Sequence, residues 1–237
     1  MKENNKISDT TLIINKSETN NKTEIENNNE NDNDNEGFPI LSQLEPIVSS
    51  SIEEYYRNNF PEYKIIKIHN IIFIKMGSLL TFNFDSNYIP KLSIGPHWYL
   101  TILLLLLIFF LSLMLYIAIF SQASWIKKAI FFFTILVEYF FVIKTALTHV
   151  KVVMNKKKSI DNDGYCSICN VYFNPNNKVE HCRFCGVCIE KMDHHCVWMG
   201  KCVAKNNTLY FYAMIANLVV VYVYVIFCGI YMALTKK

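Results

Sequence analysis

The chain has 237 residues, with 23 Lys and Arg against 20 Asp and Glu, a net charge of +3, and 52% hydrophobic residues. The charge is divided unevenly: residues 1–36 hold nine acidic residues and four lysines, a net charge of −5, which leaves +8 on residues 37–237. This composition excludes a folded core in the tail, because its few aliphatic residues cannot bury enough apolar area to offset chain entropy. We predict a disordered Asn-rich and acidic tail over residues 1–36, which also lacks the apolar core of a signal peptide.

Residues 37–97 follow as a mixed polar and apolar segment. The stretch YKIIKIHNIIFIKMGSLLTFNF alternates partly and is rich in β-branched residues. This pattern predicts short strands, which would form a small amphipathic platform on the membrane face. We expect this segment to be cytoplasmic and membrane-proximal, and His69 within it to have no functional role.

Three apolar stretches come next, at residues 98–120, 129–150 and 209–234. At about 1.5 Å per residue, each is long enough to cross a hydrocarbon layer of about 30 Å, so three transmembrane helices are predicted. The first and third carry no charge, and the second contains Glu138 near its middle. A buried carboxylate is costly in a membrane, so Glu138 is expected either to hydrogen-bond to another span or to lie near an acyl pocket. Cys228, inside the third stretch, is interpreted as a packing residue.

Seven of the eight cysteines lie between the second and third apolar stretches, in residues 166–202. Two pairs are separated by two residues, the gap that lets both sulfurs of a tight turn reach one zinc ion. Six cysteines and two histidines suffice for two sites of three cysteines and one histidine, and spacing alone leaves open whether the two sites are in series or interleaved. These eight candidate ligands are Cys166, Cys169, His181, Cys182, Cys185, Cys188, His195 and Cys202.

Asp193, His194 and Cys196 remain outside the ligand count. In an extended segment residues i and i+2 point to the same side, so His194 would lie beside Cys196 while His195 points away, towards a metal. A zinc ion held by three thiolates and one imidazole has no open position and would be structural. Activation of Cys196 must then come from His194 as the base, with Asp193 fixing its tautomer.

The side of the membrane is indicated by charge. Lys151 and Lys156–Lys158 follow the second apolar stretch, and the cysteine-rich segment carries more lysines, whereas Lys127 and Lys128 in the opposite link weaken the contrast. Reduced thiols with zinc spacing also suit the cytoplasmic side. We predict an α-helical multi-pass membrane protein with three transmembrane helices and a cytoplasmic cysteine-rich domain over residues 151–208, irregular or built of β-hairpins, that binds two zinc ions.

The segment MDHHCVWMGKCVAKNNTLYF, with CSIC and HCRFCGVC upstream, resembles the Asp-His-His-Cys (DHHC) protein S-acyltransferases, the palmitoyltransferases, over roughly residues 98–234. The resemblance implies an interleaved pair of structural zinc sites, with Cys196 as the acylated nucleophile, His194 as its base and Asp193 as the partner of that base. Asn207 and Phe211 match positions of the family after the last ligand cysteine. The implied ligand sets are Cys166, Cys169, His181 and Cys188 for one zinc, and Cys182, Cys185, His195 and Cys202 for the other.

In function, the resemblance implies transfer of a long-chain acyl group from palmitoyl-CoA, the co-substrate, through Cys196 to a cysteine of a protein. The partners would be cytoplasmic-facing proteins with membrane-proximal cysteines. The protein would be located in an endomembrane, that of the Golgi or the ER, or in the plasma membrane.

Two other readings stay open. Members of this family usually have a fourth span and a Thr-Thr-x-Glu motif, which this sequence lacks, so a catalytically silent relative is one alternative. A membrane-anchored zinc-binding adaptor is the other, although it leaves Asp193, His194 and Cys196 without a task. No nucleic-acid partner is expected, because apolar spans flank the cysteine-rich segment on both sides.

Overall fold

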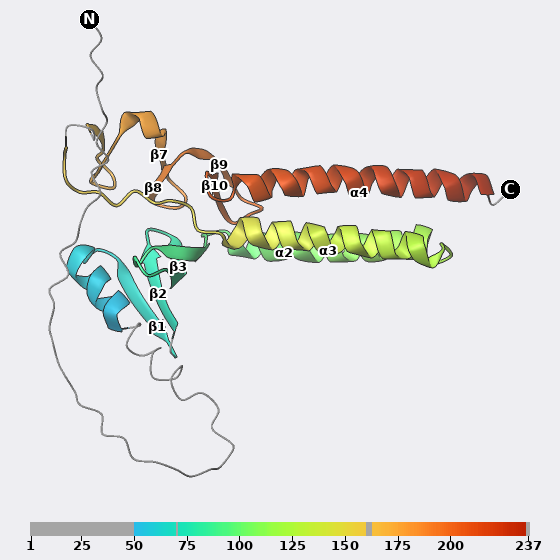
Figure 1. Cartoon of the computed structure of the whole chain (residues 1–237), viewed down its shortest axis with the longest axis horizontal. Helices are drawn as coiled ribbons and strands as arrows, with labels where there is room; N and C mark the ends of the chain where they lie inside the picture. Colours follow the sequence, from blue (N-terminus) through green and yellow to red (C-terminus); the bar gives the residue numbers. More distant parts are fainter. Residues whose placement is uncertain (1–49, 70, 160–162, 236–237) are drawn as a thin grey trace, which may run out of the picture. The chain divides into compact units, whose positions relative to one another are not determined.

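The computed structural model describes residues 50–69, 71–159 and 163–235. The expected disordered tail and residues 37–49 of the membrane-proximal segment lie outside the described residues. A helix over residues 50–59 is followed by a four-stranded antiparallel sheet in the order β1-β2-β3-β4 (Figure 1). The strands are β1 (Lys64–Ile68), β2 (Ile71–Met76), β3 (Leu79–Phe84) and β4 (Pro90–Ile94).

The sheet forms because its sequence alternates, which gives it two different faces. Ile72, Ile74 and Met76 point to one face and are buried with Ile52 and Tyr56 of the helix at residues 50–59. The same core extends into the cysteine-rich region, whose Cys182, Cys185 and Ile189 it includes. The predicted strands are therefore present, and their buried face supports the cysteine-rich domain.

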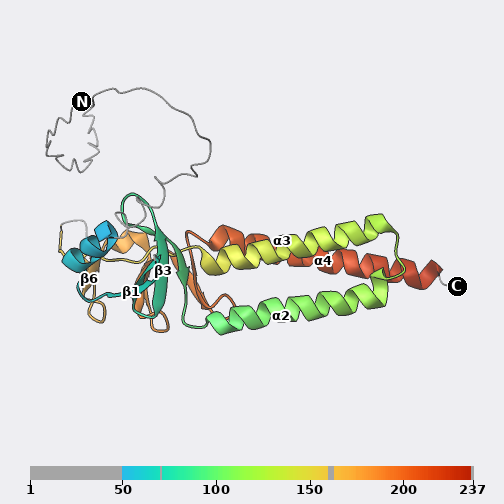
Figure 2. The same ribbon diagram turned by 90° about the horizontal axis from the view of Figure 1, so that it is seen from below.

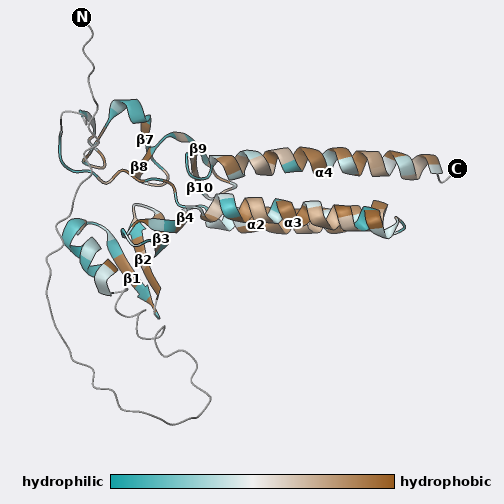
Figure 3. Cartoon of the chain, in the orientation of Figure 1, coloured by the Kyte–Doolittle hydropathy of each residue, from teal (hydrophilic) through white to brown (hydrophobic). Residues whose placement is uncertain are grey.

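In the described residues, three helices are long and apolar enough to cross a membrane, as predicted (Figure 3). They are α2 (Trp98–Leu115), which continues as the π-helical turn η1 (Tyr116–Phe120), α3 (Trp125–Leu147) and α4 (Thr208–Thr235). The first span coincides with the expected residues 98–120, and the third extends the expected 209–234 by one residue at each end.

The second span, expected at residues 129–150, begins and ends earlier. Its start includes Lys127, whose ammonium lies 3.6 Å from the ring centroid of Tyr231 on α4 and thereby finds a partner at the helix end. Its end is set by pairing, since Thr148 forms a bridge with Leu92 of β4 and the N–H of His149 donates to Lys91 O at 2.9 Å. The chain after Leu147 is therefore extended rather than helical.

Helices α3 and α4 lie side by side (Figure 2). At mid-span, Asn217 Nδ2 donates to Glu138 Oε2 at 2.8 Å and lies 3.1 Å from Thr134 O. Of the two roles considered for Glu138, the structure contains the hydrogen bond to another span. Cys228 is buried against Phe120 and Phe131, in agreement with the packing role expected for it.

The cysteine-rich region consists of three antiparallel hairpins: β5 with β6, β7 with β8, and β9 with β10. Each hairpin pairs the backbone N–H and C=O groups of its two strands, and the prediction of a β-hairpin architecture is confirmed. Their bounds are β5 (Gly164–Cys166), β6 (Val171–Phe173), β7 (Val179–Cys182), β8 (Val187–Glu190), β9 (Met192–Cys196) and β10 (Lys201–Ala204), with the 3₁₀ turn η2 (Pro175–Asn177) between β6 and β7.

Candidate active site and metal centres

The eight candidate ligands gather in two groups of three cysteines and one histidine. In the first group, His181 of β7 is paired across the hairpin with Cys188 of β8, and the β5–β6 turn contributes Cys166 and Cys169. His181 Nδ1 lies 3.1 Å from Cys169 Sγ and 3.9 Å from the other two sulfurs. The ligand atoms of each group all lie within 4.8 Å of one another.

The second group joins two hairpins. His195 of β9 is paired with Cys202 of β10, while Cys182 at the end of β7 and Cys185 in the turn that follows complete the group. Nδ1 of His195 lies 3.4 Å from the sulfurs of Cys182 and Cys202 and 3.5 Å from that of Cys185, while the sulfurs of Cys185 and Cys202 are 3.7 Å apart. Of the two arrangements that the spacing left open, the structure has the interleaved one.

Strand geometry explains the interleaving. Adjacent residues in a strand point to opposite faces, so His181 and Cys182 of β7 enter different groups although they are neighbours in sequence. The same alternation in β9 directs His195 to the second group and His194 away from it.

The donor sets fit zinc. A tetrahedral ion with Zn–S of about 2.3 Å and Zn–N of about 2.0 Å places sulfurs about 3.8 Å apart and sulfur about 3.5 Å from nitrogen. The distances in the second group, 3.4 to 3.5 Å and 3.7 Å, agree with this geometry. All eight cysteines lie in the described residues and none forms a disulfide, so the thiols of both groups are free to bind a metal.

A β-bulge places Asp193 beside His194. Val203 of β10 pairs with His194 and Ala204 pairs with Met192, so Asp193 is an extra residue without a partner on the opposite strand. A bulge re-aims the side chain of the extra residue, and Asp193 Oδ2 lies 3.6 Å from His194 Nδ1 as a result. Regular alternation would have pointed the two side chains to opposite faces of the hairpin.

Cys196 ends β9 where the hairpin meets the helices. It is half-buried and packs against a cluster that includes Met199, Val142 of α3 and Phe211 of α4. The ring of Phe211 also contacts that of His194, with centroids 5.2 Å apart. His194 and Cys196 are two residues apart in a strand, so both lie on its α4-facing side.

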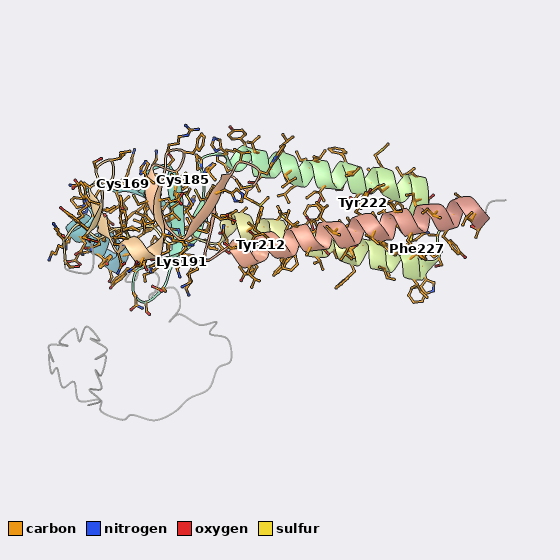
Figure 4. All side chains as sticks on the ribbon, turned by 90° about the horizontal axis from the view of Figure 1, so that it is seen from above. Cys169, Cys185, Lys191, Tyr212, Tyr222 and Phe227 are labelled. Carbon is orange, nitrogen blue, oxygen red and sulfur yellow. The ribbon has the colours of Figure 1, made fainter. Side chains whose placement is uncertain are left out.

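The start of α4 adds a further contact to this corner. The Tyr212 hydroxyl lies 3.4 Å from Asp193 Oδ2. Figure 4 shows Tyr212 at the end of α4 next to the hairpins, with Cys169 and Cys185 further into the cysteine-rich region. Asp193 therefore has a ring nitrogen on one side and a phenol on the other.

Asn207 fixes the start of α4. Its Nδ2 lies 3.1 Å from both Thr145 O and Cys202 O, and its Oδ1 accepts from Ala204 N at 2.8 Å. The side chain is fully buried. One side-chain amide thus connects the end of α3, strand β10 and the start of α4.

Sequence reasoning missed His97, which immediately precedes α2. Its Nδ1 is 3.0 Å from His195 Nε2, and both rings pack against Phe184. The N–H of His97 donates to Gly200 O at 3.1 Å, which holds the segment against the β9–β10 turn. The sequence signal that could have found it is a histidine directly before the first apolar stretch.

Lys201 was also missed. Its ammonium is fully buried and donates to Ser93 O at 3.0 Å, Ser93 Oγ at 2.9 Å and Thr148 O at 2.6 Å. Burial lowers the pKa of Lys201 to about 7, while the negative charge of the Cys185 and Cys202 thiolates acts in the opposite direction. The three hydrogen bonds join β10 to β4 and to Thr148, the residue that follows α3. A charged residue directly before a ligand cysteine was the available signal.

The chain was compared with known proteins. Residues 159–237 match the family model described as DHHC palmitoyltransferase. Palmitoyltransferase ZDHHC9 of Homo sapiens is 42% identical over 71 residues, which are 30% of this chain and 19% of the relative. Probable protein S-acyltransferase 6 of Arabidopsis thaliana is 36% identical over 74 residues, which are 31% of this chain and 18% of the relative. Palmitoyltransferase erf2 of Emericella nidulans is 43% identical over 53 residues, which are 22% of this chain and 8% of the relative.

The matched segment spans about a fifth or less of the length of these curated relatives. Residues 159–237, which the family model matches, contain both metal groups, the Asp-His-His-Cys segment and the start of α4. The resemblance found in the sequence is thereby confirmed. From residue 159 onward, this chain is similar to the DHHC palmitoyltransferase domain.

Proposed function

We propose that this protein is a protein S-acyltransferase that carries a long-chain acyl group from acyl-CoA, through a thioester on Cys196, to a cysteine of a substrate protein. The observation that supports it most is the corner formed by β9 and α4. There a half-buried cysteine shares a strand face with a histidine that has a carboxylate beside it. A thiol with an oriented base is the arrangement that nucleophilic catalysis requires.

The first half-reaction begins with proton removal. Nδ1 of His194 faces Asp193, which leaves Nε2 as the nitrogen that takes the proton from Cys196 Sγ. The thiolate attacks the carbonyl carbon of the acyl-CoA thioester, the bond between that carbon and the CoA sulfur breaks, and CoA leaves with the proton from His194. Asp193 stabilises the imidazolium during the transfer.

The second half-reaction uses the same groups. A substrate cysteine gives its proton to His194 and attacks the acyl carbon on Cys196, and Cys196 leaves as a thiolate that recovers the proton. One thioester replaces another in each step, so the two bonds are of nearly equal energy and no nucleotide is consumed.

Zinc would be held by the two groups, Cys166, Cys169, His181 and Cys188 in one, and Cys182, Cys185, His195 and Cys202 in the other. With four protein ligands each, both ions would be coordinatively saturated and would supply rigidity to the hairpins rather than an activated water. His195 adjoins His194 in β9, so the second site fixes the strand on which the base and the nucleophile stand.

The membrane supplies the geometry for a long acyl chain. Each buried methylene contributes about 0.8 kcal/mol, which favours a palmitoyl chain among the helices while its carbonyl remains at Cys196. The lysines after α3 favour a cytoplasmic cysteine-rich domain and attract the phosphates of palmitoyl-CoA. Substrates would be cytoplasmic-facing proteins with membrane-proximal cysteines, at the Golgi, the ER or the plasma membrane.

The test is self-acylation of purified protein in detergent with a clickable palmitoyl-CoA analogue. Wild type is expected to acquire a label that hydroxylamine removes, Cys196→Ser none, and His194→Ala about 10²- to 10⁴-fold less per unit time. Cys228→Ser is the matched control, because Cys228 is buried in a separate cluster with Phe120 and Phe131. It is expected to label like wild type.

Zinc content of each variant separates loss of chemistry from loss of fold. A zinc-loaded wild type that acquires no hydroxylamine-labile label would refute the enzymatic proposal and favour a membrane-anchored zinc-binding adaptor or a silent relative. Labelling that persists in Cys196→Ser would instead refute the assignment of the nucleophile.

A further inference from the structure

A cavity of about 740 Å³ lies where the four-stranded sheet meets the ends of α2 and α3. Its volume is within the range of binding pockets for small molecules, about 300–1,000 Å³. The sheet and the two membrane helices contribute apolar walls, among them Ile66, Leu80, Ile94, Ile102, Leu105 and Ile143. The cavity thus has one wall in the membrane-proximal segment and one wall in the spans.

The sheet wall belongs to a larger apolar face. The face opposite the core carries Ile66, which pairs with Phe73, and Phe82, which contacts Phe73 with ring centroids 5.5 Å apart. At its edge, Ile68 and Ile71 are 54% and 55% exposed. An apolar face of this kind, continuous with a cavity walled by membrane helices, is expected to lie against the lipid headgroup region rather than in water.

Two lysine side chains place positive charge at the cavity. Lys75 and Ser78 line it, and Lys64 is the direct cross-strand neighbour of Lys75. Both lysines are exposed, and neither forms a salt bridge with an acidic residue in the part of the chain that the structure describes. Two unpaired ammonium groups and a hydroxyl beside an apolar volume fit a phosphate attached to an acyl chain.

The helix wall shows how the occupant enters. Within α2 only Thr101 is buried, and the cavity-lining Ile102 is 48% exposed. An apolar side chain exposed on a spanning helix is open to lipid, which gives a molecule a lateral route to the cavity from the leaflet in which α2 begins. A membrane phospholipid moves in that way, whereas a soluble thioester arrives from water.

We propose that this cavity binds an anionic glycerophospholipid of the leaflet on the cysteine-rich side, with an acyl chain between the sheet and α2 and its phosphate at Lys75 and Ser78. Met199 lines the cavity and also belongs to the cluster that packs against Cys196. A bound lipid therefore packs against Met199 and stabilises the β9–β10 turn. This site is separate from the proposed acyl transfer and does not depend on it.

The test uses the Cys196→Ser variant in phosphatidylcholine nanodiscs, so that acylation of Cys196 plays no part. Phosphatidylserine and phosphatidylcholine, each with the same diazirine-bearing acyl chain, are photolysed in parallel, and labelled peptides are mapped by mass spectrometry. Labelling of the sheet and of the first turns of α2 is expected to be several-fold stronger with phosphatidylserine.

Two variants and a control locate the site. Lys75→Glu is expected to lower the preference for phosphatidylserine about 5-fold or more, since each lysine near an anionic surface contributes about 1 kcal/mol. Leu80→Trp, which fills the cavity, is expected to reduce labelling by both lipids at unchanged zinc content. Lys91→Glu, exposed on the same sheet but outside the cavity, is expected to keep the wild-type ratio.

Three results would overturn the proposal: equal labelling by the two lipids, a preference that Lys75→Glu leaves intact, or labelling of the cavity that micromolar palmitoyl-CoA displaces. The last result would assign the cavity to acyl-CoA. Because lipid labelling and self-acylation are measured on different variants, either proposal can fail without the other.

Discussion

Nδ1 of His97, the residue that precedes α2, lies 3.0 Å from Nε2 of His195 in β9. The other nitrogen of His195 faces the sulfurs of Cys182, Cys185 and Cys202. In the proposed zinc site, Nδ1 of His195 would bind the metal, and its Nε2 would then carry the proton and donate to His97 Nδ1. Partners of this kind orient a ligand histidine and fix its tautomer.

We predict that His97→Ala loses one of the two zinc ions to a chromogenic chelator about 10- to 100-fold faster than wild type. His97→Asp, which restores a hydrogen-bond acceptor, should recover much of the retention. His69→Ala serves as the control, since His69 is exposed in the turn between β1 and β2. Release from His97→Ala at the wild-type rate would show that the contact does not hold the metal site.

A second prediction concerns the close approach of Gly95 to the β9–β10 turn. A Cβ at Gly95 would lie 2.1 Å from Gly200 O and 2.4 Å from Lys201 Cβ, so the backbone must shift to accept it. Gly95→Ala should lower the free energy of unfolding by about 2 kcal/mol or more, measured by thermal unfolding in detergent.

Gly229→Ala is the matched control for that substitution. Gly229 lies inside α4, and its added Cβ would meet only Ile119 Cδ1 at 3.8 Å, an ordinary contact. Because Ala favours helix over Gly by up to about 1 kcal/mol, this variant should unfold at the wild-type temperature or above it. Equal destabilisation by both substitutions would contradict the packing described at Gly95.

A third prediction tests the hydrogen bond between spans. Glu138 and Asn217 should show a coupling energy of about 0.6 kcal/mol, and at most about 1.7, in a double-mutant cycle of Glu138→Leu and Asn217→Leu. Glu138→Gln retains a hydrogen-bond acceptor and should lower the free energy of unfolding less than Glu138→Leu does.

Ser112→Ala provides the reference for that cycle, since the Ser112 hydroxyl bonds only to Phe109 O of its own helix. Its combination with Asn217→Leu should be additive. A Glu138–Asn217 cycle that is equally additive would show that the contact contributes nothing to the association of α3 and α4.

The fourth prediction concerns pH and His149, which lies just after α3. Burial, followed by the charge of Lys201, lowers the pKa of His149 to about 3, and its Nδ1 is buried without a hydrogen-bond partner among the residues that the structure describes. Between pH 6.5 and about 3 the unfolded state therefore binds a proton that the folded state does not. Stability should fall as the pH is lowered through this window, by up to about 1.4 kcal/mol per pH unit.

Thermal unfolding measured from pH 7 to pH 5 checks this dependence. Wild type and His149→Leu carry the same zinc ligands, so acid-driven metal release affects both equally. The slope of unfolding temperature against pH should be smaller in His149→Leu. Identical slopes would show that His149 is not the group responsible.

The sequence alone determined the composition of the site. Zinc ligands follow from side-chain chemistry and from the two-residue gaps, and the spans follow from the length of apolar runs, both of which are local properties. The extended form of residues 192–196 was also expected, and β9 has it. What local pattern left open was the pairing of ligands, because strands far apart in sequence bring them together.

Only the tertiary structure decided how the site is held. The bulge that places Asp193 beside His194 depends on pairing with β10, and the acceptor that His97 offers to His195 comes from 98 residues away. The burial of Lys201 depends on β4 and on the end of α3. Such contacts join elements whose separation in sequence carries no periodic signal, so their positions emerge only when the sheet, the hairpins and the helices pack together.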